Sequence, residues 1–225
     1  MKKIRTSIII PARNEEEGIA ITLKEIRQFT NNSYEVLVVD GASTDNTTKV
    51  AESYDCLTAK QDRDELGKGI GLRMGFDFAH GDKIVWIDAD DTYPVNMIPR
   101  IVKELDKYDV VVCSRKYGKE HMPKFNRFGN WLFKVLIQKL HGFKGNDPCT
   151  GLYGVKREHL LKMGLTSTHF AIEPEISIKA GHMKLKTLDI PITYKLRIGD
   201  TNLNPIKVGF EDLWTIIKLI GWRPK

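Results

Sequence analysis

Residues 83–91, KIVWIDADD, decide the fold, because an apolar run rich in β-branched residues ends abruptly in acidic side chains. A run of this kind is typical of a strand that is buried on both faces of a parallel sheet. The alternation of such strands with helical patterns predicts an α/β domain with a mostly parallel central sheet and helices on both faces. The other strand patterns lie at residues 6–10, 35–39, 57–59 and 110–113, and the helical ones at 15–29, 46–53, 66–79 and 97–108.

The composition fits one globular domain, or one domain with an appendage. The chain has 225 residues, of which 41% are hydrophobic and 28% are charged, and this balance is typical of a soluble protein. No apolar run approaches the roughly 20 residues that span a bilayer, so we expect neither a spanning helix nor a signal peptide. Three cysteines without CxxC spacing argue against a disulfide framework or a zinc site, and they favour a cytoplasmic location.

Polar residues follow three of the predicted strands: PARNE at 11–15, DGASTD at 40–45 and DADD at 88–91. Ligands bind beyond the carboxyl ends of strands in open α/β sheets, so these loops are the candidate site. Asp88 and Asp90 lie on the same side of an extended segment, where they repel each other unless a cation lies between them. Mg²⁺ or Mn²⁺ suits such oxygen ligands. A run of helix-capping aspartates is the simpler alternative.

Basic charge is concentrated in two segments. Residues 113–144 hold eight Lys or Arg and one acid, and residues 195–225 hold six and three. This pattern predicts a surface for phosphates, anionic lipid or nucleic acid, although a solvated lysine face explains it as well. Two amphipathic helices are predicted in these segments, at 126–141 and 207–222, and each carries Trp beside Lys or Arg. We expect them to lie in a membrane interface; the alternative is that they pack on each other or on the sheet.

Four motifs in the first 95 residues, IIIPARNE, VVDGASTDNT, GKG and DAD, resemble the family 2 inverting glycosyltransferases of GT-A fold. The resemblance implies metal-dependent transfer of a hexose from a nucleotide sugar. It assigns Asp88, Asp90 and Thr92 to the metal, which is Mg²⁺ or Mn²⁺. It assigns the nucleotide sugar to Pro11, Ala12, Asn14, Glu15, Asp40, Lys68, Asp88, Ala89 and Asp90.

The later half is similar to the dolichyl-phosphate mannose synthase subgroup, on the segments CSR at 113–115, Arg127, NDPCTGLY at 146–153 and RIGDTNL at 197–203. That resemblance implies transfer to a polyprenyl or dolichyl phosphate, with Arg115 and Arg127 binding the acceptor phosphate. It also implies peripheral attachment at the cytoplasmic face of a membrane, directly or through a membrane-anchored partner subunit. GDP-mannose is the expected donor; a UDP-sugar carrying glucose or N-acetylhexosamine remains open, with a lipid-phosphate or another saccharide acceptor.

The resemblance sets the domain boundaries and leaves some residues open. It implies a catalytic domain at 1–204, including the helix at 126–141, and a separate amphipathic helix at 205–225. Asn202 stands where the subgroup usually has Lys, so Arg197 or Lys207 would have to contact the diphosphate. Asp147 is a candidate for orienting an arginine or the sugar, or it forms only an Asx turn. Glu173 and Glu175 are weaker candidates of the same kind.

Four other functions can be weighed against this one. Residues 88–92, DADDT, also fit the DxDxT motif of haloacid-dehalogenase-type phosphatases, with Asp88 as nucleophile and Asp90 as acid. Those enzymes place the motif after the first strand, unlike this chain. A non-catalytic module that binds nucleotide sugar or anionic membrane would use the same basic segments. No GxGxxG follows the first strand, which argues against a dinucleotide enzyme, and no recognised motif supports nucleic-acid binding.

Overall fold

The computed structural model describes residues 4–199 and 204–224. Strands and helices alternate through most of the chain. The strands are β1 (Thr6–Ala12), β2 (Tyr34–Asp40), β3 (Leu57–Lys60), β4 (Lys83–Ile87), β5 (Val110–Tyr117), β6 (Leu152–Lys156) and β7 (Thr187–Thr193). The α-helices are α1 (Glu16–Ile26), α2 (Thr47–Ser53), α3 (Lys68–Phe78), α4 (Ile98–Glu104), α5 (Lys124–His141), α6 (Arg157–Met163), α7 (Ile172–His182) and α8 (Pro205–Lys218); 3-10 turns η1 (Val95–Met97) and η2 (Lys119–His121) precede α4 and α5.

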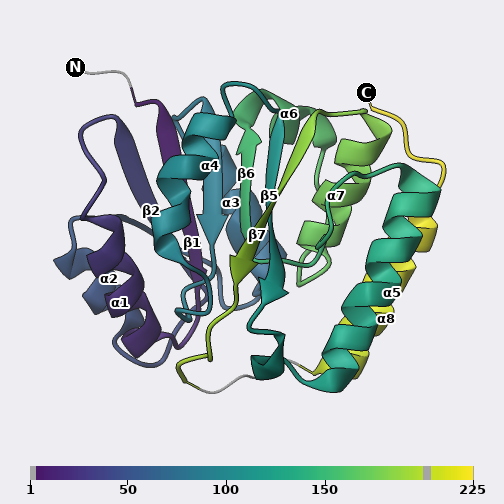
Figure 1. Cartoon of the computed structure of the whole chain (residues 1–225). Helices are drawn as coiled ribbons and strands as arrows, with labels where there is room; N and C mark the ends of the chain where they lie inside the picture. Colours follow the sequence, from purple (N-terminus) through teal and green to yellow (C-terminus); the bar gives the residue numbers. More distant parts are fainter. Residues whose placement is uncertain (1–3, 200–203, 225) are drawn as a thin grey trace.

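The seven strands form one sheet in the order β3-β2-β1-β4-β6-β5-β7 (Figure 1). All neighbouring pairs are parallel except those of β6, which runs antiparallel to β4 and to β5. Leu152 at the start of β6 pairs with Ile87 at the end of β4. The segment before β6 therefore lies at the same edge of the sheet as the acidic residues that follow β4.

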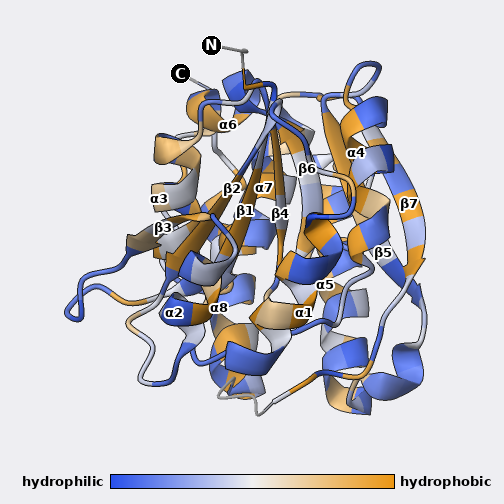
Figure 2. Ribbon diagram, turned by 90° about the vertical axis from the view of Figure 1, so that its left-hand side faces the viewer, coloured by the Kyte–Doolittle hydropathy of each residue, from blue (hydrophilic) through white to orange (hydrophobic). Residues whose placement is uncertain are grey.

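Helices cover both faces of the sheet, as the sequence predicted. Alternate residues of the strands point to opposite faces, so Ile84 and Trp86 pack on one side and Val85 and Ile87 on the other. The first side is covered by α3, α6, α7 and the inner faces of α5 and α8, and the second by α1, α2 and α4. The central strands are correspondingly apolar in Figure 2. The predicted α/β class with a mostly parallel sheet is confirmed.

The two amphipathic helices lie side by side at one end of the sheet (Figure 1), with contacts between them. Helix α5 begins two residues before the predicted start at 126, and α8 occupies residues 205–218 where 207–222 was predicted. Asn204 caps α8 by accepting hydrogen bonds from the backbone N–H groups of Ile206 and Lys207. Both helices bury one side and leave large apolar side chains exposed on the other. Among the described residues, no helix combines the length and apolar character needed to cross a bilayer.

Candidate active site

The polar loops after β1, β2 and β4 line a pocket of about 420 Å³, which we call the carboxylate pocket. Of the residues assigned to the nucleotide sugar, it contains Pro11, Ala12, Asn14, Glu15, Lys68, Asp88, Ala89, Asp90 and Arg197. Its wall also includes residues that the sequence did not single out, among them Gln61, His169 and Phe170. The strand-end rule therefore locates this pocket correctly and misses the wall that comes from the loop before α7.

A buried lysine pairs with the first acidic residue of the pocket. The Lys68 ammonium lies 2.7 Å from the Asp88 carboxylate and 2.6 Å from that of Glu173 on α7. Burial raises the pKa of both Asp88 and Glu173, while Lys68 opposes the increase. Burial alone would lower the pKa of Lys68, but the two carboxylates raise it overall. Lys68 therefore acts within the protein as a counter-ion that fixes Asp88 in place.

An arginine pairs with the second acidic residue. Arg197 makes ion pairs with both Asp90 and Glu15. The Thr92 hydroxyl, fully buried, donates a hydrogen bond of 2.6 Å to Asp90. Burial raises the pKa of Glu15 to about 7; Asp90 and Asp88 add to this effect, and Arg197 opposes it. Three carboxylates thus converge on one pocket, and their repulsion is offset by the protein's own cations. The assignment of Thr92 to a metal remains a prediction.

Hydrogen bonds connect the loop after β1 to the loop after β2 at the carboxylate pocket. The Asn14 side-chain oxygen accepts a 2.8 Å hydrogen bond from the backbone N–H of Thr44. Asp40 is buried and accepts hydrogen bonds from Ser43 and from the Thr48 hydroxyl. It therefore shapes the loop after β2 but does not itself line the pocket. Asn14, Ala42 and Asp91 all have left-handed backbone conformations, with φ values of 54, 56 and 58°. Non-glycine residues in this conformation store strain, which is common at binding sites.

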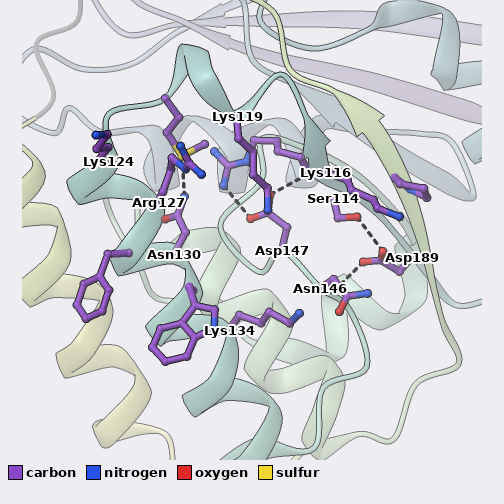
Figure 3. Close-up of a pocket in the computed structure, with 15 residues that line it drawn as sticks. Ser114, Lys116, Lys119, Lys124, Arg127, Asn130, Lys134, Asn146, Asp147 and Asp189 are labelled. Carbon is purple, nitrogen blue, oxygen red and sulfur yellow. Dashed lines mark hydrogen bonds and ion pairs between the residues drawn. The ribbon is translucent and has the colours of Figure 1, made fainter.

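A second, larger pocket of about 850 Å³ lies between β5, η2 and α5 (Figure 3), and we call it the basic pocket. Arg115 and Arg127, which the resemblance assigned to the acceptor phosphate, line it together with Asp147, the candidate for orienting an arginine or the sugar. The charge count pointed to this segment without identifying the individual lysines. The basic pocket also contains Lys116, Lys119, Lys124 and Lys134, together with Asn146 and Asp189 from the opposite wall.

The two predicted arginines differ in their surroundings. The Arg115 side chain is only 9% exposed, and its Nε and Nη2 atoms donate to Asp147 at 2.6 and 2.7 Å. Nη2 also donates to the Cys149 carbonyl at 2.9 Å. Burial opposes ionisation of Asp147, but Arg115 holds the pKa of Asp147 below its usual value. Arg127 on α5 is exposed and, within the described residues, makes no ion pair. The sequence prediction that Asp147 orients an arginine agrees with this geometry.

Residues 147–151 connect the two pockets. At one end, Asp147 holds Arg115 in the basic pocket. At the other end, Gly151 lies against the first metal candidate: a Cβ atom on Gly151 would lie 2.1 Å from Asp88 Oδ2. The Thr150 hydroxyl fixes the middle of the segment by donating to the Cys113 carbonyl at 2.7 Å. A side chain at position 151 would therefore displace the Asp88 carboxylate, and the two pockets are neighbours at one edge of the sheet.

Two predicted residues, Lys207 and Glu175, line neither pocket. Lys207 is exposed at the beginning of α8, outside the lining of either pocket. Asn202 lies outside the described residues. Glu175, a weaker candidate, contacts neither pocket; it pairs with Lys179 at 2.5 Å and accepts hydrogen bonds from Thr166 and Ser167. It therefore fixes the loop that carries His169 and Phe170 to the carboxylate pocket.

The carboxylate pocket has ligands suited to a divalent ion that is shared with substrate. Within residues 4–199 and 204–224, no group of three or more His, Cys, Asp or Glu side chains is arranged to enclose a metal ion. Asp88 and Asp90 nevertheless face one pocket, and Mg²⁺ is commonly bound by one or two carboxylates together with phosphate oxygens. The residues present therefore fit a metal ion that arrives with a phosphorylated ligand.

Comparison with known proteins identifies the family. Residues 7–164 match Glycosyl transferase family 2. A Haloferax volcanii protein named dolichyl-phosphate hexose transferase is 30% identical over 215 residues, which cover 95% of this chain and 92% of that protein. The Pyrococcus furiosus dolichol-phosphate mannosyltransferase is 28% identical over 98% of this chain and 65% of its own length.

Solved structures support the same fold. Glucosyl-3-phosphoglycerate synthase from Mycobacterium tuberculosis, determined with Mn²⁺, UDP and glucosyl-3-phosphoglycerate, aligns with a TM-score of 0.74 at 20% identity. The alignment covers 98% of this chain and 81% of that protein. The family match replaces the haloacid-dehalogenase interpretation of residues 88–92. The sequence motifs, the arrangement of strands and the matched relatives together show that this chain belongs to glycosyltransferase family 2 and has the GT-A fold.

Proposed function

We propose that this glycosyltransferase transfers a hexose from a nucleotide sugar to a polyprenyl or dolichyl phosphate, with inversion and with a divalent metal ion. GDP-mannose is the first donor to test. The names of the Haloferax volcanii and Pyrococcus furiosus relatives support the acceptor class, and the second also supports mannose. The donor occupies the carboxylate pocket in this proposal, and the acceptor phosphate occupies the basic pocket.

The observation that carries the proposal is the chemical character of the basic pocket. Arg127 has no ion-pair partner among the described residues, so an anion can bind there without breaking an existing pair. Phe128 and Trp131 also line the pocket, and they are 60% and 56% exposed. A pocket that combines unpaired cations with exposed aromatic rings suits an amphiphile with an anionic head and an apolar chain.

The reaction needs few protein groups. A phosphate oxygen of the lipid attacks the anomeric carbon, and the bond from that carbon to the nucleoside diphosphate breaks. The lipid phosphate is anionic near neutral pH, so a general base is not required. When bound to Asp88 and Asp90, the metal ion would stabilise the charge that develops on the diphosphate. Arg127 offsets repulsion between the acceptor and the donor phosphates. It is assisted by the Nη1 atom of Arg115, which has no hydrogen-bond partner among the described residues.

We place the protein peripherally at the cytoplasmic face of a membrane, directly or with a membrane-anchored partner. The exposed apolar side chains lie on two adjacent helices, α5 and α8, and α5 also lines the basic pocket with its cations. Apolar side chains flanked by basic residues favour binding at a lipid interface. These side chains are Phe125, Phe128, Trp131 and Leu140 on α5, and Ile206, Phe210, Trp214 and Ile217 on α8.

The test is transfer of labelled sugar into organic-extractable lipid. Purified protein is incubated with Mg²⁺ or Mn²⁺, a polyprenyl phosphate and a panel of labelled GDP- and UDP-sugars, with the unphosphorylated polyprenol as control. We expect one donor to label the lipid phosphate and none to label the polyprenol. If nucleoside diphosphate is released with metal but no lipid is labelled, the acceptor is wrong. If neither occurs with any donor, a non-catalytic binding module is favoured.

A further inference from the structure

Helix α5 presents one polar seam to the basic pocket. Arg127, Asn130 and Lys134 follow steps of three and four residues, so they lie on the same side of the helix, and all three line the pocket. Lys134 is half-buried, unlike the exposed Arg127. In Figure 3 the Lys134 side chain extends across the pocket toward Asn146 on the opposite wall. The Lys134 side chain is therefore aimed into the pocket.

The acids of the pocket are already engaged with other groups. Asp147 is bonded to Arg115. Asp189 accepts hydrogen bonds from the Ser114 hydroxyl at 2.8 Å and from the Asn146 backbone N–H at 2.6 Å. In the part of the chain that the structure describes, Lys134 has neither a hydrogen-bond nor an ion-pair partner. A half-buried ammonium group without a counter-ion is costly, and an anion from outside the protein would remove that cost.

We infer that Lys134 is a phosphate ligand of the acceptor, which is clamped between Arg127 and Lys134 on one seam of α5. This inference rests on the proposed function and makes it more specific. Two nitrogen atoms of Arg115 are already committed to Asp147 and Cys149, so Arg115 chiefly positions residues 146–151. The acceptor charge is thus met mainly by a helix that also carries exposed aromatic rings.

The seam also sets the direction of the lipid chain. Phe128 and Trp131 occupy the positions next to the seam on the exposed side of α5, with ring centroids 5.9 Å apart. A phosphate held by Arg127 and Lys134 places the first isoprene units over these two rings. The phosphate is then held in the pocket, while the rest of the chain can extend along the exposed apolar side of α5.

The experiment compares Lys134→Ala with Lys134→Arg and with Lys139→Ala. Lys139 is exposed on the same helix and does not line the basic pocket, so it controls for the loss of one surface charge. The readouts are kcat, KM for a short-chain polyprenyl phosphate, nucleoside diphosphate release without acceptor, and calorimetric binding of farnesyl phosphate. Thermal melting of each variant checks that it folds.

We expect Lys134→Ala to raise the acceptor KM and the farnesyl phosphate Kd about 10- to 100-fold, as for loss of one charge-assisted hydrogen bond. Release of nucleoside diphosphate without acceptor should stay within about twofold, because the donor pocket is unchanged. Lys134→Arg should retain binding within about threefold, because it keeps the charge. Lys139→Ala should match the wild type.

The outcomes separate this inference from the proposed function. If the wild type transfers sugar to polyprenyl phosphate and Lys134→Ala does so with an unchanged KM, the inference is wrong and the proposed function stands. Equal losses in Lys134→Ala and Lys139→Ala would also overturn it, because they indicate a general charge effect. If the wild type neither binds farnesyl phosphate nor labels lipid, the acceptor proposal itself fails.

Discussion

The carboxylate pocket and the basic pocket lie at the same edge of the sheet but differ in whether their charged side chains are paired within the protein. In the carboxylate pocket, Asp88 is paired with Lys68, and Asp90 and Glu15 are paired with Arg197. In the basic pocket, the carboxylates are engaged, while Arg127 and several lysines have no partner within the described residues. Each carboxylate of the first site thus already has a cation of the protein as its partner, whereas the second site holds cations without partners that are available to an anion.

This difference predicts how each site responds to its ligand. The existing ion pairs hold Asp88 and Asp90 in place before a metal ion binds. A metal ion that binds these carboxylates has to replace or share those ion pairs. An anion that enters the basic pocket forms new ion pairs and breaks none. Substitutions in the first pocket should therefore affect both stability and chemistry, and substitutions of the unpaired cations should affect only acceptor use.

The largest effect is expected for Asp90→Ala. Loss of this carboxylate removes a proposed metal ligand and leaves Arg197 with only Glu15. We expect lipid labelling and nucleoside diphosphate release to fall together, by about a thousandfold. Asp91→Ala is the matched control, because Asp91 pairs with Lys195 at 2.8 Å and does not line the pocket. Comparable losses in both variants would contradict the assigned role.

Gly151→Ala should come next, because it disturbs the contact between the pockets without removing a charge. The new Cβ would lie 2.1 Å from Asp88 Oδ2, so the carboxylate has to move. We expect metal-dependent turnover to fall about 10- to 100-fold, since a small misplacement of a catalytic group is costly. Gly221→Ala, where the added atom meets nothing within 4 Å, is the control. A fully active Gly151→Ala would show that the position of Asp88 is not critical.

A stability comparison sharpens the contrast between paired and unpaired cations. Lys68→Gln leaves the buried carboxylate of Glu173 without its cation, and we expect a loss of about 3 kcal/mol in the free energy of unfolding. Lys119→Gln removes an exposed lysine of the basic pocket, where we expect a change of about 0.5 kcal/mol or less. Urea unfolding of both variants measures the difference. Equal and small losses would show that the Lys68 pairs contribute little to stability.

The smallest effect concerns an acid behind the carboxylate pocket. Asp212 on α8 is 4% exposed, and burial, with Glu173 and Glu211, raises its pKa to about 8. Asp in an unfolded chain has a pKa of about 3.9. Between about pH 4 and about pH 8, the folded protein therefore keeps a proton on Asp212 that the unfolded chain has lost. Stability should therefore fall as pH rises from about 4 to about 8.

Asp212→Asn removes this dependence because the amide stays neutral. The variant should gain about 1–3 kcal/mol over the wild type at pH 8 and almost nothing near pH 4. Urea unfolding at the two pH values measures the gain. A variant that is equally destabilised at both pH values would show that Asp212 is ionised and bonded in the folded protein.

Much of the fold could be predicted because its first half follows local rules. The apolar runs that form β1, β2 and β4 are buried on both faces, and such runs are recognisable without any knowledge of their partners. Strands β6 and β7 were not predicted. β6 contains Gly154 and β7 contains Pro191, which weaken a strand pattern, and β7 tolerates its proline as the last strand of the sheet.

The candidate site was predictable only in part. Residues after strand ends, such as Asn14 and Asp88, are found by the topological rule. The ion pairs that define their charge state are not, because Lys68 meets Glu173 and Glu15 meets Arg197 only after the chain folds. The same holds for Lys134: the charge count identifies its segment, but only the geometry shows which lysines line the pocket and which of them is half-buried.

The most direct test of the account measures Arg127→Ala in two assays with the same enzyme preparation. One assay follows transfer to a polyprenyl phosphate over a range of acceptor concentrations, and the other follows metal-dependent nucleoside diphosphate release without acceptor. We predict an acceptor KM at least about tenfold higher, with release within about twofold of the wild type. An unchanged KM, or an equal loss in both assays, would contradict the assignment of the basic pocket to the acceptor phosphate.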